Sequence, residues 1–314
     1  MNYLFIESEK SFNENSHCRW FRLCRSTFDR VFPQKKYSII LISRTRQTPK
    51  HALIRNATWE ELSKDVKLLE GVDAIVNLAG ESINQRWTSA AKERILQSRL
   101  DTVNQIASIV SRLDTKPAVV VNASGISIYG TSETESFVEH SEPNVKDFLS
   151  GVVEQWEQAM DQIQDTRLVK LRLGIVLGTD GGAFPKMMLP YKYGIGGRIG
   201  SGKQVLSWIH VEDLCRLIDF CIENEDIIEQ VNATAPQPAT NDEFGRTLAK
   251  VMRTSHRIPV PAFIMKLMFG ELSTLLLEGQ RVFPYLAIEY EFDFKYPTLT
   301  MALQDLVGAK DQLK

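Results

Sequence analysis

The sequence lacks the features that point to a membrane or to a partner of strong charge. Its 37 basic and 39 acidic residues leave a formal net charge of −2, which gives no reason to expect nucleic acid. No apolar run reaches the length of a membrane span, and Glu7, Glu9 and Glu14 stand where a secretion signal is apolar. The four cysteines form no Cys-x-x-Cys pair. We therefore expect a cytoplasmic protein with inert thiols.

What is present is a regular alternation of short apolar runs and longer helical patterns. A chain of 314 residues with 43% apolar side chains can bury a large core. The alternation predicts βαβ units, and so an α/β fold with a doubly wound parallel sheet covered by helices on both faces. Thr88 is the expected N-cap of one long helix. The predicted strands are 37–43, 72–77, 118–122 and 168–174, and the predicted helices are 87–113, 145–163 and 210–223.

The pattern changes after about Ala235, where six prolines punctuate short helical pieces such as 262–277. This change predicts a division into a domain over 1–235 and a small, mostly helical region over 236–314. We expect the second region to cap the ligand edge of the sheet.

Small or polar residues follow several of the predicted strands. Ser43 and Arg44 end the first one, Asn77 to Gly80 the second, Ser124 and Gly125 the third, and Gly174 to Gly178 a later one. Ligands of an open parallel sheet bind beyond the carboxyl ends of its strands. These residues are therefore predicted to line one crevice.

Ordered motifs between Ser38 and Leu306 carry a resemblance to a known family. The chain resembles the extended short-chain dehydrogenase/reductase superfamily, and within it the bacterial epimerase-family group with a small C-terminal domain of unknown role. The resemblance implies a Rossmann-like fold that binds NADP or NAD, with a substrate pocket between the sheet and the C-terminal part. The matching residues are Asn77–Ser82, Arg86 and Trp87, Ser98 and Arg99, Asn122–Gly125, Ile128–Gly130, Trp156 and Glu157, Arg172–Gly178, Gly200–Gly202, Trp208–Asp213 and Asn232–Pro236.

The resemblance implies particular cofactor contacts. Arg44, after Ser43, matches a position where the group places a cation beside the ribose 2′-phosphate, so NADP is favoured over NAD. A turn of small residues lets the backbone approach the adenosine half. For Arg99 a helix-surface ion pair is an equal alternative, and for the later strand end ordinary strand termination is one. The implied cofactor residues are Ser43, Arg44, Leu78, Ala79, Gly80, Arg99, Gly174, Ile175 and Val176.

The catalytic pair of the superfamily is absent. A Tyr hydroxyl transfers the proton there, and a Lys four residues later stabilises its phenolate, yet no Tyr in this chain has Lys at that spacing. A phenol titrates near pH ~10, so without a nearby cation it is a poor base at neutral pH. Ser124 matches the Ser/Thr that hydrogen-bonds the substrate oxygen. The proton carriers proposed from sequence are Tyr129 and His210, although a lone His beside Trp208 is more often structural.

The phosphate-binding turn is also absent. Dinucleotide folds open with a strand and a Gly-x-Gly-x-x-Gly turn, but the first glycine here is Gly71. When suitable codons for residues 13–28 are read one base later, they encode a strand, such a turn and a helix start. We therefore hypothesise that residues before about Lys35 come from a displaced reading frame, with the first strand and glycine loop lost. The alternative is a divergent N-terminus, and sequencing the gene decides between them.

Other motifs are weaker. The Gly197–Lys203 stretch has P-loop spacing, but Gln204 stands where Ser or Thr should meet Mg²⁺, so we interpret it as a mobile loop over the substrate pocket. The histidines and cysteines show no metal-site spacing.

Two functions stay open: an NADP-dependent oxidoreductase or epimerase acting on a small hydroxylated molecule, and a non-catalytic NADP-binding sensor or interaction protein. A homodimer is expected by analogy alone.

Overall fold

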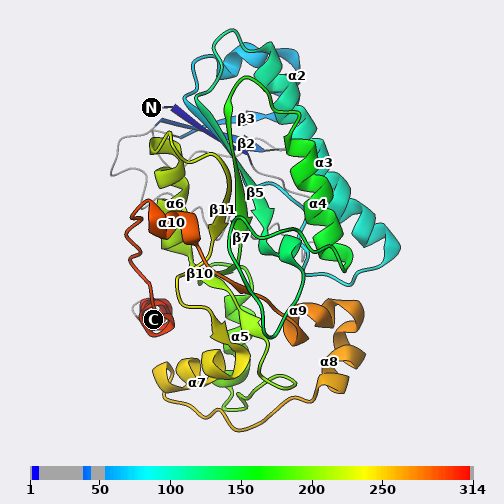
Figure 1. Cartoon of the computed structure of the whole chain (residues 1–314), viewed down its shortest axis with the longest axis vertical. Coiled ribbons are helices and arrows are strands. Elements are labelled where there is room, and N and C mark those ends of the chain that lie inside the picture. The colour runs from blue at the N-terminus through cyan, green and yellow to red at the C-terminus, as the bar shows by residue number, and fades with distance from the viewer. Residues whose placement is uncertain (1, 7–37, 44–53, 312–314) are drawn as a thin grey trace.

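The computed structural model of the chain describes residues 2–6, 38–43 and 54–311. Its centre is a seven-stranded sheet in which every neighbouring pair is parallel, in the order β11-β7-β5-β4-β1-β2-β3 (Figure 1). The strand order reverses between β1 and β4, which is where dinucleotide folds bind their ligand. The α/β, Rossmann-like fold expected from the sequence is confirmed. The strands are β1 (Asn2–Ile6), β2 (Ser38–Ser43), β3 (Ile54–Thr58), β4 (Ala74–Asn77), β5 (Val119–Gly125), β7 (Arg167–Leu173) and β11 (Glu229–Ala233).

The first strand corrects one expectation. The sequence suggested that it is lost, but Asn2–Ile6 forms β1 in the middle of the sheet, with Leu4 in register with Ile40 of β2 and Ile75 of β4. The residues of the displaced-frame hypothesis, and any turn between β1 and β2, lie outside the described residues.

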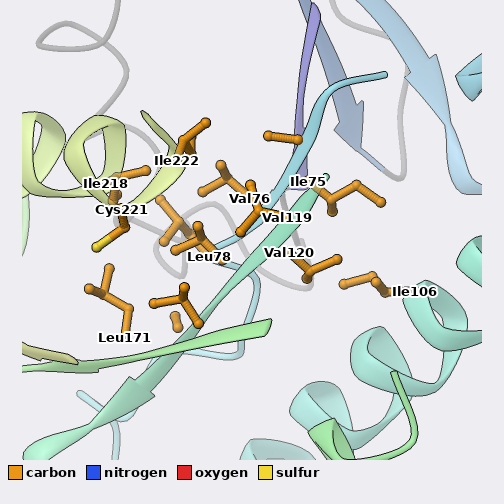
Figure 2. Packing of buried hydrophobic residues seen from close by; sticks show 14 of the residues in the cluster. Ile75, Val76, Leu78, Ile106, Val119, Val120, Leu171, Ile218, Cys221 and Ile222 are labelled. Carbon is orange, nitrogen blue, oxygen red and sulfur yellow. The ribbon is translucent and has the colours of Figure 1, made fainter. Parts of the chain in front are cut away.

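Helices cover both faces of the sheet. Helix α3 (Ser89–Arg112) packs beside α4 (Phe148–Met160) on one face, and α6 (Val211–Glu223) lies on the other (Figure 1). Thr88 caps α3 as predicted, its side chain accepting the Ala91 N–H at 3.2 Å. The strands between these helices consist of β-branched and apolar residues that are buried on both sides, as parallel strands are. Figure 2 shows Val76, Val119 and Val120 packed between Ile106 of α3 and Ile218 of α6.

A second hydrophobic core lies on the C-terminal side of the molecule. It joins Phe184 and Trp208 to Phe244, Leu248 and Leu303, so it crosses the division predicted at residue 235. The expected helical piece 262–277 is interrupted by Gly270 at φ +57°. Over the part of the chain that is described, no helix has the length and apolar character to cross a lipid bilayer. The remaining elements are α2 (Trp59–Lys64), β6 (Ser136–Phe137), β8 (Ile175–Leu177), α5 (Phe184–Lys192), β9 (Val205–Leu206), β10 (Trp208–His210), β12 (Ala239–Thr240), α7 (Asn241–Val251), α8 (Ala262–Phe269), α9 (Thr274–Leu277), β13 (Arg281–Val282), α10 (Tyr285–Glu289) and α11 (Leu299–Asp311), with 3₁₀ turns η2 (Val66–Leu69), η3 (Ile126–Tyr129) and η4 (Gly270–Ser273).

The loop after α5, which the sequence analysis interprets as mobile, makes backbone hydrogen bonds to the segment before α8. The carbonyl of Gly196 accepts the N–H groups of Arg257 and Ile258 at 2.8 and 3.1 Å, and that of Arg198 accepts the Val260 N–H at 2.9 Å. A Cβ atom at Gly197 would lie 1.8 Å from the Ile258 carbonyl oxygen. Glycine is therefore required where the two segments meet.

We expect Gly197→Ala to lower the free energy of unfolding by about 2 kcal/mol or more, because the added methyl meets backbone that cannot move aside. The matched control is Gly151→Ala in α4, whose Cβ would meet only Val145 Cγ1 at 3.9 Å. Alanine in this helix should stabilise the protein by about 0.5–1 kcal/mol. Urea unfolding measures both changes, and equal stabilities for the two variants would contradict the close packing of this loop.

Candidate functional site

The turn after β4 is fixed by two asparagines on neighbouring strands. Asn77 Nδ2 donates to Asn122 Oδ1 at 2.6 Å, and Asn77 Oδ1 accepts the Ala79 N–H at 3.0 Å. Both side chains are completely buried. Because a buried amide must satisfy its polar groups, this pairing sets the direction in which the chain leaves the strand.

The same turn meets Arg99 of α3. The guanidinium Nη1 donates to the Glu81 carbonyl at 3.1 Å and to the Ile95 carbonyl at 2.7 Å. A Cβ at Gly80 would lie 3.1 Å from Arg99 Cζ, so the missing side chain makes room for this cation. The structure therefore brings Gly80 and Arg99, both implied by the resemblance, to one place. Leu78 differs, because its side chain belongs to the hydrophobic core (Figure 2), and only its backbone can face a ligand.

The other implied cofactor residues lie at strand ends on both sides of β4 and β5. Ser43 ends β2 and is fully buried, whereas Arg44 lies outside the described residues. Gly174 follows β7, and a Cβ there would lie 2.4 Å from the Ser207 carbonyl oxygen. Ile175 and Val176 begin β8, which pairs with β10. Gly174, Ile175 and Val176 shape the carboxyl edge of the sheet on the far side of β5 from β4, whereas Ser43 lies on the other side of β4.

Ser124, at the end of β5, belongs to a buried polar network. Its Oγ donates to Glu157 Oε1 of α4 at 2.5 Å. Arg172 of β7 lies opposite Ser124 and holds the same carboxylate with two hydrogen bonds, Nε to Oε1 at 2.9 Å and Nη2 to Oε2 at 2.8 Å. All three side chains are buried. A buried ion pair of this kind is tolerated because its geometry is bidentate and its remaining groups find partners.

Arg172 also supplies Tyr129 with the cation that the sequence did not reveal. Its Nη1 lies 2.9 Å from the phenol oxygen, and the phenol donates to Asn232 Oδ1 at 2.8 Å. Tyr129 is completely buried and its ring stacks on Phe137. Burial raises the pKa of Tyr129 and outweighs the opposing effect of Arg172. At neutral pH this tyrosine is therefore a hydrogen-bond donor inside the protein.

Glu139 closes the network on its other side. Its carboxylate accepts the N–H groups of Asn232 and Tyr285, each at 3.0 Å, which ties β11 to the start of α10. Burial raises the pKa of Glu139, while these backbone hydrogen bonds lower it. The carboxylate is thus a structural connection between the sheet and the C-terminal region.

His210 caps helix α6. Its Nδ1 accepts the Glu212 N–H at 3.1 Å, so a neutral imidazole carries its proton on Nε2. That atom lies 3.3 Å from Asp305 Oδ2 without the alignment of a hydrogen bond, and the ring packs against Tyr296 with centroids 3.8 Å apart and planes tilted by 34°. With only 1% of its surface exposed, His210 is enclosed by α11 and the segment before it. Of the three proposed catalytic residues, Ser124 and Tyr129 share one network and His210 does not join it.

The sequence reasoning missed the roles of Glu157 and Arg172. Both belong to motifs that carried the family resemblance, but nothing in their spacing showed that they meet. Among the described residues, no group of three or more His, Cys, Asp or Glu side chains is arranged to hold a metal ion.

Comparison with known proteins agrees with this architecture. The model of the NAD dependent epimerase/dehydratase family matches residues 26–233, and a domain of unknown function, DUF1731, matches residues 260–306. The epimerase family protein YfhF of Bacillus subtilis is 37% identical over 281 residues, which are 88% of this chain and 92% of that protein. The resemblance stated from the motifs is therefore confirmed.

Solved structures show the same fold. The human epimerase family protein SDR39U1, crystallised with NADPH, has a TM-score of 0.86 and 31% identity, covering 98% of this chain and 99% of the human one. The UDP-glucuronic acid 4-epimerase from Bacillus cereus, in complex with NAD, has a TM-score of 0.73 and covers 100% of this chain and 99% of its own. At 14% identity, the second likeness concerns the fold alone.

The raised pKa of Tyr129 predicts a loss of stability in alkali. Its phenol titrates near pH ~10 in the unfolded chain and higher in the folded protein, so its contribution is complete below pH ~10 and is lost as the pH rises further. The unfolding free energy of Tyr129→Phe should fall less steeply above this pH than that of the wild type. Tyr193→Phe is the control, since Tyr193 is 73% exposed. Urea unfolding at several alkaline pH values measures the slopes, and parallel slopes for the wild type and Tyr129→Phe would contradict the assignment.

The capping role of His210 predicts a difference between two substitutions. Asparagine offers an oxygen to the Glu212 N–H and alanine does not, so His210→Asn should be more stable than His210→Ala by about 1 kcal/mol. Thermal and urea unfolding measure the difference. Equal destabilisation by both substitutions would mean that the cap contributes little and that packing on Tyr296 dominates.

Proposed function

The chain belongs to the NAD dependent epimerase/dehydratase family, and we propose that it binds NADP(H) at the carboxyl edge of the sheet and acts as an oxidoreductase or epimerase on a small hydroxylated molecule. The observation that supports this best is the Gly80 turn with Arg99, placed beside the point where the strand order reverses. We propose residues 236–314 as the substrate-side region.

The fit of a dinucleotide can be judged from the turn itself. A phosphorylated cofactor needs accessible backbone and a nearby cation. At Gly80 no side chain covers the backbone, the Arg99 guanidinium lies beside it, and the end of β1 is close by. We propose that the backbone of Leu78, Ala79 and Gly80, together with Ser43 and Arg99, holds the adenosine half. The strand end Gly174–Val176 is proposed to border the nicotinamide.

The preference for NADP rests on Arg44. A guanidinium binds a ribose 2′-phosphate well, whereas NAD binding favours an acidic residue that accepts from the free ribose hydroxyl. The human relative was crystallised with NADPH, which supports the same choice. In the sequence, Arg44 follows directly after Ser43, the last residue of β2.

The proposed chemistry divides between cofactor and protein. When bound, the nicotinamide exchanges a hydride with a substrate carbon. Ser124 is proposed to contact the substrate oxygen, and Arg172 and Glu157 fix the Ser124 hydroxyl. We keep Tyr129 and His210 only as secondary candidates for proton transfer, because the Tyr129 hydroxyl donates to Asn232 and His210 Nδ1 caps α6.

A non-catalytic NADP-binding sensor is the second candidate. It is favoured by a specific observation: the phenol of Tyr129 and the Nδ1 atom of His210 are both engaged in structural hydrogen bonds. A sensor would bind NADPH but would not change its absorbance with any substrate. An enzyme would consume it with some member of a substrate panel, and Ser124→Ala would lower that consumption.

Titration with the two reduced cofactors tests the proposal. We expect NADPH to bind at least about tenfold more tightly than NADH, because one charge-assisted phosphate contact is worth roughly 1.5–3 kcal/mol. Arg44→Ala should weaken NADPH binding by a similar factor and leave NADH unchanged. Gly308→Ala, on the exposed side of α11, is the control for both. Fluorescence titration gives the dissociation constants, and a protein that binds neither nucleotide would overturn the proposed function.

A further inference from the structure

The hydroxyl of Ser124 has a single proton, and the structure shows where it goes. Oγ donates to Glu157 Oε1 at 2.5 Å, inside a site where Ser124 is 3% and Glu157 is 8% exposed. Hydrogen bonds to a charged group are about twice as strong as neutral ones. A ligand that needs a donor from Ser124 would have to break this bond.

The direction of that hydrogen bond follows from Arg172. The guanidinium makes two bonds to the Glu157 carboxylate, and a guanidinium has donors only, so both carboxylate oxygens must act as acceptors. Glu157 Oε1 therefore accepts from Ser124 as well as from Arg172 Nε. Rotating the Ser124 hydroxyl outward would give up a charge-assisted bond in a buried site.

We propose that Ser124 presents only its lone pairs to a ligand, so that the site selects a hydroxyl group in preference to a carbonyl at this position. Glu157 is the positioning residue that fixes this polarity. The proposal rests on the proposed function and makes it more specific. The substrates expected to bind best are secondary alcohols.

Glu157→Gln weakens the bond that holds the Ser124 proton. Arg172 donates to both carboxylate oxygens, so in either orientation the NH₂ group of an amide meets one guanidinium donor. The amide oxygen is also uncharged, so it accepts from Ser124 less strongly than the carboxylate does. The Ser124 proton can then turn toward a ligand at lower cost, and the variant should shift the preference from alcohols toward carbonyl compounds.

The experiment uses matched pairs of secondary alcohols and ketones, offered with NADP⁺ and NADPH respectively. We expect Ser124→Ala to raise KM for the alcohols roughly fivefold, the loss expected for one hydrogen bond, with little change for the ketones. Glu157→Gln should raise KM for the alcohols and lower it for the matched ketones. Ser127→Ala, a neighbour outside the network, should change neither value.

A second measurement needs neither substrate nor cofactor. In the cofactor-free protein, proton NMR should show a low-field, slowly exchanging hydroxyl resonance from the short Ser124–Glu157 bond. It should be absent from Ser124→Ala, move to higher field in Glu157→Gln and stay unchanged in Ser127→Ala. If the wild type has no such resonance, the hydroxyl is not fixed and the proposal is overturned, whatever the stability of the variants.

The outcomes separate this proposal from the function on which it rests. If the wild type binds no NADPH, the proposed function fails and this inference fails with it. If it binds NADPH but converts no pair, the sensor is favoured and selection of an alcohol substrate is overturned. If it converts the pairs and both variants keep the wild-type ratio of the alcohol KM to the ketone KM, the proposed enzymatic function is supported and the proposed role of Glu157 is overturned.

Discussion

The bidentate ion pair between Arg172 and Glu157 is the constraint on which the arrangement around the ends of β5 and β7 depends. Two charges are buried here, and such a pair persists only where each remaining donor and acceptor is satisfied. Ser124 and Tyr129 provide those partners, so the orientations of both hydroxyls follow from the pair. The pair also joins α4 to β7, and through Tyr129 and Asn232 it reaches β11. This one ion pair thereby fixes the directions of the hydroxyl hydrogen bonds near the carboxyl edge of the sheet.

The other half of that edge is organised by shape. At Gly80 the absence of a side chain admits Arg99, and Asn77 and Asn122 turn the chain at the end of β4. The two halves are separated by β5, whose end carries Ser124. A nucleotide on one side and a hydroxylated molecule on the other would meet at this strand, which agrees with the general placement of ligands in open parallel sheets.

The sequence predicted the sheet and its long helices because buried parallel strands are continuous apolar runs and because Thr88 is a recognisable cap. It did not predict β1, a five-residue strand followed by polar residues, because so short a run carries little periodicity. The cation near Tyr129 could not be predicted from local spacing, because Arg172 reaches the phenol from another strand. The contacts of the loop at Gly197 could not be predicted either, because backbone hydrogen bonds leave no mark on side-chain composition.

Tyr129 does not take the place of the missing Tyr-x-x-x-Lys pair, although Arg172 provides a nearby cation, because the phenol is buried. A cation lowers the pKa of a phenol, and Arg172 acts on Tyr129 in this direction, yet burial raises the pKa by more. A phenol that is enclosed by protein gains no reactivity from a neighbouring cation, because the same burial that strengthens the ion pair disfavours the phenolate. Ser124, which lies at the strand end, is held by a carboxylate instead. The two hydroxyls therefore differ in their partners: the Tyr129 phenol donates to an amide oxygen, and the Ser124 hydroxyl donates to a carboxylate.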